Sequence, residues 1–168
     1  MRHTILLALA LAATPFDAGQ AEPPRTAVFD LQLVDTSLEG EMNGASEAES
    51  RRLAMLSERL RAALAASGRY ELVDIAPVRE AANQQNLQSC GGCDRRLAAE
   101  VGADLALTGF VQKVSNLILN INLVVRDVES GKVVEGYSAD IRSNTDESWT
   151  RGLDWILKNR LLAEEAPK

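Results

Sequence analysis

The sequence has little of the chemistry on which many enzymes depend. Its 168 residues include one histidine and two cysteines, and only 4% of them are aromatic. The histidine, His3, lies in a segment that we predict is removed on export, so the mature chain is expected to have none. The absence of an imidazole excludes Ser-His-Asp and Cys-His nucleophiles and histidine-based zinc sites. We therefore expect a protein that is not an enzyme and that carries no cofactor or metal.

The balance of charge excludes a further class of function. Asp and Glu number 24 against 18 Lys and Arg, which gives a net charge of −6. Proteins that bind the phosphate backbone of nucleic acids need clustered basic side chains, and single-strand binders need aromatic stacking platforms. The sequence has neither feature, so no nucleic-acid partner is expected.

Residues 1–21 have the features of a cleaved secretory signal. A basic start at Arg2 precedes an apolar run too short to span a bilayer, and Gly19 and Ala21 are small residues where a signal peptidase requires them. We predict cleavage after Ala21, which leaves residues 22–168 as a single periplasmic domain. No later segment is long and apolar enough to cross a membrane.

The spacing of apolar residues predicts alternating strands and helices. Strands are expected at residues 26–35, 70–75, 104–112, 117–126 and 133–141. Helices are expected between Ser46 and Gly68, at residues 77–85 and 94–101, and from a cap at Asn144 or Thr145 onwards, with a loop at residues 36–45.

The order of these elements, β-α-β-α-α-β-β-β-α, predicts the fold class. Helical crossovers make the first strands parallel, whereas the short turn between the last two strands makes an antiparallel hairpin. We predict an α/β domain of α+β character, with a mixed sheet of about five strands packed by helices and a carboxy-terminal hairpin and helix.

The first helix carries the clearest local signals. Ser46 and Glu49 match a capping box, in which each residue satisfies a backbone amide of the other. Leucines then recur at the helical period and predict a buried stripe of Leu53, Leu56, Leu60 and Leu64.

The motif Cys90-Gly-Gly-Cys93 is the most reactive-looking feature. In an exported protein the two cysteines are expected to pair, and we favour a structural disulfide that staples the loop to the following helix. One alternative is a thiol–disulfide exchange centre, since the positive end of the helix would stabilise a thiolate. Another is a metal role. Attachment of c-type haem is excluded because Asp94 follows where a histidine is needed.

Carboxylates crowd the end of the first strand and the loop after it, at Asp30, Asp35, Glu39 and Glu41. Ligands gather at the carboxyl ends of strands in open α/β sheets, and a cation such as calcium would need several such oxygens. No EF-hand spacing is present, so we favour a solvated acidic loop over a metal site.

Two polar groups are candidates for binding a partner. One consists of amides on a single strand face, and the other lies at the junction between the last strand and the last helix. The candidate residues are Asn116, Asn120 and Asn122 on the strand, and Arg142, Asn144, Asp146 and Trp149 at the junction. The strand amides are alternatively no more than exposed polar groups, and the junction alternatively caps the helix with Trp149 in the core. Tryptophan and arginine are favoured anchors in protein interfaces.

Several stretches resemble known families. One set resembles the amino-terminal domain of TolB and the related core of CsgG-like and LpoB-like envelope proteins; it consists of AVFDL, LAASGRYELVD, LAAEVGADLALTG and SGKVV. A second set resembles an exported bacterial family known as a domain of unknown function (DUF2380/DUF3280-type); it consists of DTSLEG, CGGCD, VQKVSNLILNINLVVRD and NTDESWTRGLDW. The first resemblance implies the fold. The sequence lacks the propeller of TolB and the lipid-bearing cysteine of CsgG and LpoB, so their transport and secretion roles are not expected.

Together these features predict a non-catalytic periplasmic accessory or adaptor protein that binds another periplasmic or envelope protein. The alternative is a thiol–disulfide factor or one that handles a small ligand or a metal. Some members of the second family are neighbours of periplasmic quinoprotein alcohol-oxidation genes, so that resemblance implies an accessory role in that oxidation.

Overall fold

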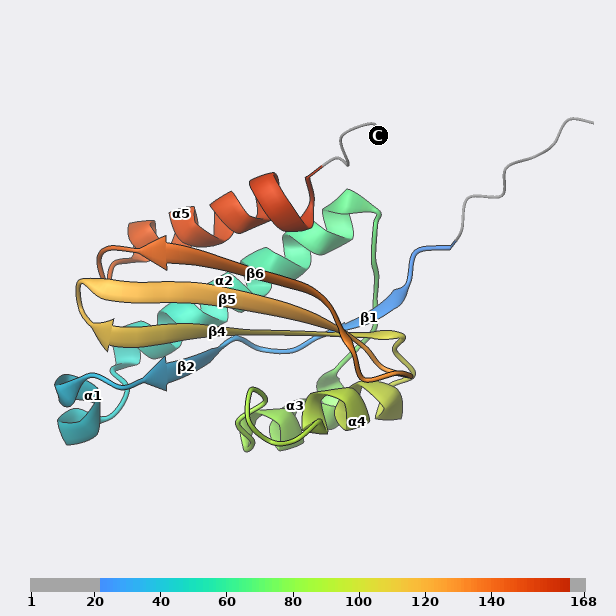
Figure 1. The fold of residues 1–168 in the computed structure, drawn as a ribbon, viewed down its shortest axis with the longest axis horizontal. Helices are drawn as coiled ribbons and strands as arrows, with labels where there is room; N and C mark the ends of the chain where they lie inside the picture. The colour runs from blue at the N-terminus through green and yellow to red at the C-terminus, as the bar shows by residue number, and fades with distance from the viewer. Residues whose placement is uncertain (1–21, 164–168) are drawn as a thin grey trace, which may run out of the picture.

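The computed structural model describes residues 22–163 (Figure 1). The predicted signal, residues 1–21, therefore lies outside the described residues. In chain order the elements are β1 (Arg25–Val28), β2 (Gln32–Asp35), α1 (Leu38–Asn43), α2 (Glu47–Ser67), β3 (Glu71–Leu72), α3 (Ala76–Asn83), α4 (Cys93–Glu100), β4 (Leu105–Ser115), β5 (Ile118–Asp127), β6 (Val133–Ile141), α5 (Asp146–Ile156) and a π-helical turn (Leu157–Leu161). No helix among these is long and apolar enough to cross a bilayer.

One mixed sheet organises the domain, as predicted. Its strand order is β3-β1-β4-β5-β6, and β2 also pairs with β4. The strands β1, β2 and β3 run parallel to their neighbours, whereas β4, β5 and β6 form two consecutive antiparallel pairs. The α+β fold class, the parallel crossovers and the terminal hairpin are therefore confirmed.

The sheet has six strands because the first predicted strand is interrupted. β1 and β2 lie end to end along β4, and the backbone between them leaves the ladder. There the amide of Leu31 donates to the Oγ of Ser57 on α2, at 2.9 Å, instead of to a neighbouring strand. The interruption ties the middle of the sheet to the longest helix.

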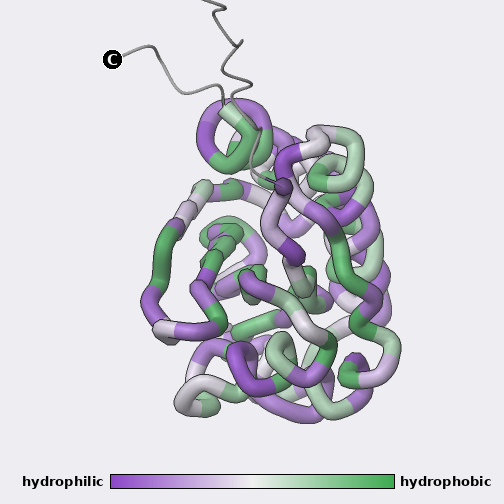
Figure 2. The backbone as a smooth tube through the Cα atoms, turned by 90° about the vertical axis from the view of Figure 1, so that its right-hand side faces the viewer, coloured by the Kyte–Doolittle hydropathy of each residue, from purple (hydrophilic) through white to green (hydrophobic). Residues whose placement is uncertain are grey.

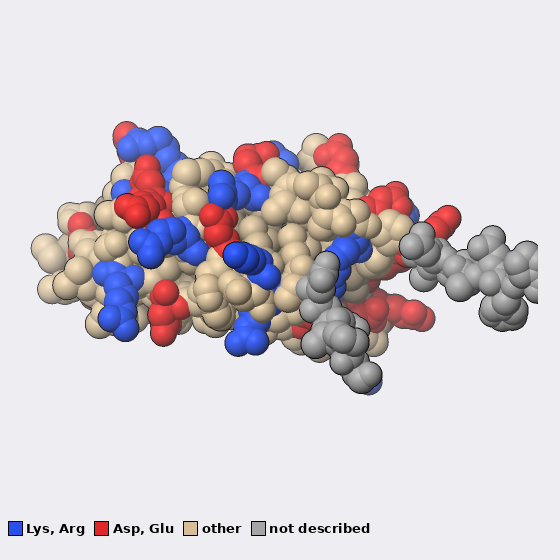
Figure 3. All heavy atoms as spheres, turned by 90° about the horizontal axis from the view of Figure 1, so that it is seen from above, with Lys and Arg blue, Asp and Glu red and all other residues tan. Residues whose placement is uncertain are grey.

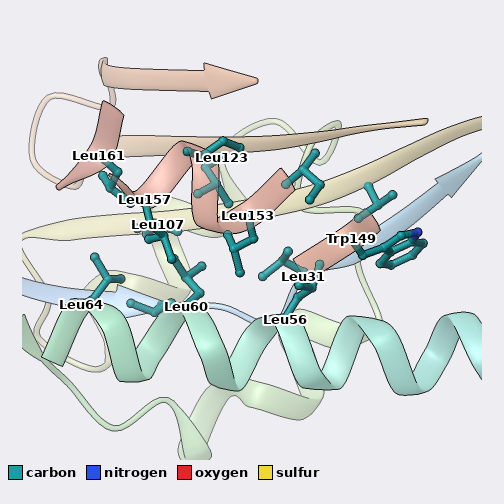
Figure 4. Packing of buried hydrophobic residues seen from close by; sticks show 14 of the residues in the cluster. Leu31, Leu56, Leu60, Leu64, Leu107, Leu123, Trp149, Leu153, Leu157 and Leu161 are labelled. Atoms are coloured by element: carbon teal, nitrogen blue, oxygen red, sulfur yellow. The ribbon is translucent and has the colours of Figure 1, made fainter. Parts of the chain in front are cut away.

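Helices cover both faces of the sheet. α2 and α5 pack on one face, and the shorter α3 and α4 lie against part of the other (Figure 1). The predicted leucine stripe of α2 points into the larger core, where it meets α5 and the sheet (Figure 4). Hydrophobic and hydrophilic stretches alternate along most elements in Figure 2, the pattern of elements buried on one side.

Two boundaries differ from the sequence predictions, and a third, predicted at either of two residues, is now assigned to one of them. The predicted loop at residues 36–45 contains α1, which starts because the Ser37 hydroxyl accepts a hydrogen bond from the Gly40 amide at 3.1 Å. The second strand is only two residues long, since β3 pairs with β1 through Glu71 and Leu72 alone. The final helix is capped by Thr145, whose side chain accepts from the Ser148 amide.

One local prediction is confirmed in detail, and a glycine in β4 shows a second close contact. Ser46 and Glu49 form the complete capping box, with both reciprocal hydrogen bonds present. Gly109 marks a close approach inside β4, because a Cβ atom there would lie 2.7 Å from the Leu123 side chain on β5. Both features fix the position of α2 and β5 around the larger core.

We expect Leu60→Ala to lower the free energy of unfolding by about 2–5 kcal/mol, because it opens a cavity where a fully buried side chain meets α5 and the sheet. Urea unfolding followed by circular dichroism measures the loss. Met55→Ala on the same helix is the matched control, since Met55 is 38% exposed. Its loss is expected to stay below about 1 kcal/mol, and equal losses for the two variants would contradict this core.

Candidate protein-docking surfaces

A buried lysine organises the end of the sheet where β4 turns into β5. Alternation along β4 places Lys113 on the same face as Leu107 and Val111, toward the larger core, and the side chain is only 1% exposed. Its Nζ lies 2.7 Å from the Glu49 carboxylate and 3.1 Å from that of Asp35. Burying an ammonium group is costly unless charges compensate it, and these two carboxylates supply the compensation.

The same contacts perturb the ionisation of the cluster. Burial alone would raise the pKa of Glu49, but hydrogen bonds from Lys113, Ser46 and Asn144 outweigh it and lower that pKa to about 2. Burial alone would lower the pKa of Lys113, but Glu49 and Asp35 raise it above its ordinary value. The cluster is therefore an ion pair throughout the neutral range.

Several residues predicted to bind a partner make hydrogen bonds within this cluster. The Asn144 side chain donates to Glu49 at 2.8 Å and to Asn116 at 2.9 Å. Arg52 of α2 donates to Asn144 at 3.0 Å and to Asp146 at 2.6 Å. The strand–helix junction is thus bound to α2 and to the β4–β5 turn.

Trp149 is fully buried and belongs to the larger core. The guanidinium carbon of Arg52 lies 5.8 Å from the centre of its ring, a distance at which a cation and an aromatic face attract each other. This places Trp149 in the core, the alternative that the sequence left open. A partner cannot reach it in this structure.

Asn120 and Asn122 lie on the opposite face of the sheet, away from Asn116. Their neighbours Leu119, Ile121 and Leu123 point into the larger core, so alternation turns the two amides toward the side of α3 and α4. Both are half-buried, and Asn122 donates to Asn120 at 2.5 Å. The structure therefore divides the three strand amides between two separate places.

The acidic residues at the end of the first predicted strand and in the loop after it also pair with two different basic residues. Asp30 pairs with Arg61 of α2, whereas Asp35 and Glu39 turn to Lys113. Burial raises the pKa of Asp30, but the hydrogen bond and charge of Arg61 lower it overall. Asp30 therefore serves one cation of the protein itself, Arg61, whereas Asp35 and Glu39 share another, Lys113.

The two cysteines lie at the start of α4, within disulfide distance, and their Cα atoms are 5.6 Å apart. Gly91 and Gly92 between them both have positive φ angles, which glycine adopts without strain. Cys93 is fully buried among Phe29 and Leu97, whereas Cys90 is half-buried and accepts the Cys93 amide at 3.2 Å. The motif links the loop before α4 to a second, smaller hydrophobic core, which α3 and α4 form with the sheet.

A groove of about 650 Å³ lies between β2, α2 and the end of α3. Gln32, one of its lining residues, donates to the Gln85 carbonyl at 2.7 Å and accepts the Leu87 amide at 3.0 Å. These bonds tie the loop after α3 to the sheet, which is a structural role.

A second groove, of about 760 Å³, runs between β6 and α5. It contains Arg142, one of the predicted partner-binding residues, together with Arg151, Gly152 and Trp155. Trp155 is 45% exposed, so this second tryptophan is the accessible one. We refer to this region as the β6–α5 groove.

Trp155 was not among the predicted binding residues, although the sequence contains a signal for its exposure. Trp149 and Trp155 are six residues apart, which on a helix of 3.6 residues per turn places them on different faces. Because Leu153 and Ile156 continue the buried face with Trp149, Trp155 had to lie outside it. Lys113 was also not predicted as the centre of the cluster. The signal was the two-residue alternation along β4, which places Lys113 on the same face as Leu107 and Val111.

The fold of this chain resembles that of the LpoB C-terminal domain. The LpoB C-terminal domain from Escherichia coli superposes with a TM-score of 0.53 and 19% identity, over 74% of this chain and 87% of that one. The corresponding domain from Salmonella enterica gives 0.51 and 18%, over 75% and 87%. The solution structure of E. coli LpoB gives 0.51 and 16%, over 86% and 80%. At these identities the likeness concerns the fold.

The sequence assigns the chain to a family. The family described as "Protein of unknown function (DUF2380)", with the model DUF3280, matches residues 24–161. The chain belongs to this family, as its sequence motifs indicated. Comparison with curated proteins gives no match.

The buried cluster makes stability depend on pH in a defined direction. Ionised Glu49 contributes its full stabilisation above the ordinary glutamate pKa of 4.5, and loses it as the pH falls toward about 2. Between pH 7 and pH 3 this single group is expected to cost about 2 kcal/mol of unfolding free energy. Urea unfolding of the protein and of Glu49→Gln at both values measures the difference.

Glu58→Gln is the control for this experiment, because the Glu58 side chain is exposed at 74% and pairs only at the surface. Its unfolding free energy is expected to fall between pH 7 and pH 3 as steeply as that of the unmodified protein. The unfolding free energy of Glu49→Gln should be lower than that of the unmodified protein at pH 7, and it should fall less steeply between pH 7 and pH 3. Parallel pH dependence in all three proteins would refute the role of Glu49.

Proposed function

We propose that this protein is a non-catalytic accessory or adaptor protein of the bacterial cell envelope, exported to the periplasm, and that it binds another protein through the β6–α5 groove. The observation that carries the proposal is an exposed tryptophan beside a long open sheet edge. The LpoB-type fold, shared with proteins of the envelope, supports the setting.

The edge of the sheet at β6 suits the addition of a strand. In the described part of the chain β6 is nine residues long and pairs with β5 on one side only, whereas β3 at the other edge has two residues. An unpaired edge presents a row of backbone donors and acceptors that an extended segment of another chain can satisfy. The partner segment is therefore expected to bind as a strand.

Side chains of a partner strand added at β6 would pack into the β6–α5 groove. Gly152 brings α5 close to the sheet, since a Cβ atom there would lie 2.5 Å from the Ile141 side chain, and Trp155 stands further along the same helix. The Arg160 guanidinium lies 5.4 Å from the Trp155 ring centre and supports the exposed indole. Indole and guanidinium groups are the side chains that most often dominate binding energy at protein interfaces.

The chemistry of the sequence supports a role without catalysis. Only His3, in the predicted signal, could act as an imidazole base, and the buried ion pairs around Lys113 are engaged in holding elements together. A general base must be free to take a proton near neutral pH, whereas Glu49 has a pKa of about 2.

Trp155→Ala is expected to reduce recovery of the partner by roughly thirtyfold, which corresponds to about 2 kcal/mol for loss of a central aromatic anchor. The measurement is crosslinking in the periplasm followed by pull-down, with the recovered protein quantified relative to the bait. Met55→Ala is the control, because it shortens an exposed apolar side chain on α2, away from the groove.

Two results would count against this function. The first is repeated failure of the unmodified protein to recover a partner in stoichiometric amount. The second is equal recovery by Trp155→Ala and Met55→Ala, which would move the binding surface elsewhere. Unchanged thermal unfolding of both variants establishes that recovery reports binding.

Thiol–disulfide exchange is a second candidate, favoured by the different exposure of the two cysteines. Cys90 is half-buried at the positive end of α4 and its sulfur accepts the Cys93 amide, so an attacking thiolate can reach Cys90 before the fully buried Cys93. Such exchange would reduce this disulfide to two thiols while oxidising a partner dithiol to a disulfide.

For the structural disulfide that we favour, protein taken from the periplasm should contain no free thiol, and glutathione should not reduce it. Thiol titration before and after incubation with glutathione makes the measurement, with the denatured protein as the control for complete reaction. Rapid reduction of the folded protein would instead support the exchange candidate.

A further inference from the structure

A second exposed surface lies at the end of the molecule opposite to β3, where α1 lies beside the β4–β5 turn (Figure 1). Large apolar side chains there are between 49% and 74% exposed. They are Leu38, Met42, Val114, Leu117 and Ile118, which we call the apolar end. In Figure 3 the left-hand tip of the molecule is mainly uncharged. Apolar side chains gathered at one end of a protein mark an interaction site more often than scattered ones.

The apolar end is held in place by the buried cluster. The Thr36 amide donates to the Lys113 carbonyl at 2.9 Å, directly before α1 begins. Asn116 in the turn donates to Glu39 on α1 at 2.8 Å, and Glu39 also lies 3.4 Å from the Lys113 ammonium. These bonds join α1 to the turn, so the two apolar segments are presented together.

Charge around the apolar end is mainly negative. Residues 36–46, which include α1, contain two carboxylates, Glu39 and Glu41, and no lysine or arginine. Glu39 and Glu41 lie on α1 next to Leu38 and Met42, and Lys113, the nearest buried cation, is compensated by Glu49 and Asp35. Arg142, after β6, is the basic side chain on the other flank.

We propose that the apolar end is a second docking surface, and that its occupant is a protein surface with aliphatic or aromatic anchors flanked by lysine or arginine. The apolar side chains would bury the anchors, and the carboxylates of α1 would face the basic flanks. A second copy of this chain would bring like charges together. The groove proposed for partner binding shares none of the five apolar residues. An adaptor with both surfaces can join two proteins.

A pair of short helical peptides tests this surface directly. One carries a leucine stripe flanked by lysines, and its twin has glutamate in place of every lysine. Methyl NMR spectra of the protein purified from the periplasm report where each peptide binds. The lysine peptide is expected to shift the methyl signals of the apolar end and to bind roughly tenfold more tightly than its twin, and to weaken as salt is added.

Matched variants separate the two parts of the proposal. Leu117→Ser should weaken the lysine peptide roughly tenfold, whereas Met55→Ser, which also removes an exposed apolar side chain, should not. Glu41→Gln should weaken it and reduce its salt dependence, whereas Glu129→Gln in the β5–β6 turn should do neither.

Several outcomes overturn the proposal. They are binding of neither peptide, equal binding of the twin, methyl shifts outside the apolar end, and equal effects of a variant and its control. Two further outcomes assign the surface to another occupant: self-association in sedimentation that Leu117→Ser abolishes, and co-sedimentation with phosphatidylcholine or phosphatidylglycerol vesicles. Because the variants lie outside the β6–α5 groove, none of these outcomes alters the test made with Trp155→Ala.

Discussion

The ammonium group of Lys113 and the carboxylates that surround it are the interaction on which one half of the structure depends. The cluster connects β2, α1, α2, β4 and the β6–α5 junction, segments far apart in the sequence. Inside a protein, an ion pair that loses one member leaves an uncompensated charge, which is more costly than the pair itself is favourable. The segments must therefore come together as a set, and Asn116 and Asn144 complete the set by bonding to each other and to the carboxylates.

This arrangement has a consequence for function. Polar residues at the strand–helix junction, which could have met a partner, are used inside the molecule, and the surfaces that stay accessible lie beside the cluster. On one side is the β6–α5 groove with Trp155, and on the other the apolar end. Rigid support beneath an exposed anchor lowers the entropy that binding must overcome. The cluster is thus suited to hold the two proposed docking surfaces in a fixed relation, as the proposed adaptor role requires.

Local and periodic signals in the sequence predicted the fold well. The capping box at Ser46 and Glu49, the leucine stripe of α2 and the alternation in β5 each depend on neighbours a few residues away, and each is confirmed. α1 was missed because a six-residue helix containing Gly40 has little periodicity to detect. The interruption after Val28 was missed because it depends on Ser57, whose position relative to Leu31 only the folded chain defines.

The sequence by itself determined the fold class and the family, since short-range spacing and local motifs are enough for those conclusions. Only the tertiary structure decided which polar residues are accessible. It placed Trp149 in the core and Trp155 at the surface. It also paired Glu49 with the ammonium group of Lys113, in addition to its role in the capping box with Ser46. The physical reason is that exposure and charge compensation depend on residues distant in sequence, and the sheet brings those residues together only after folding.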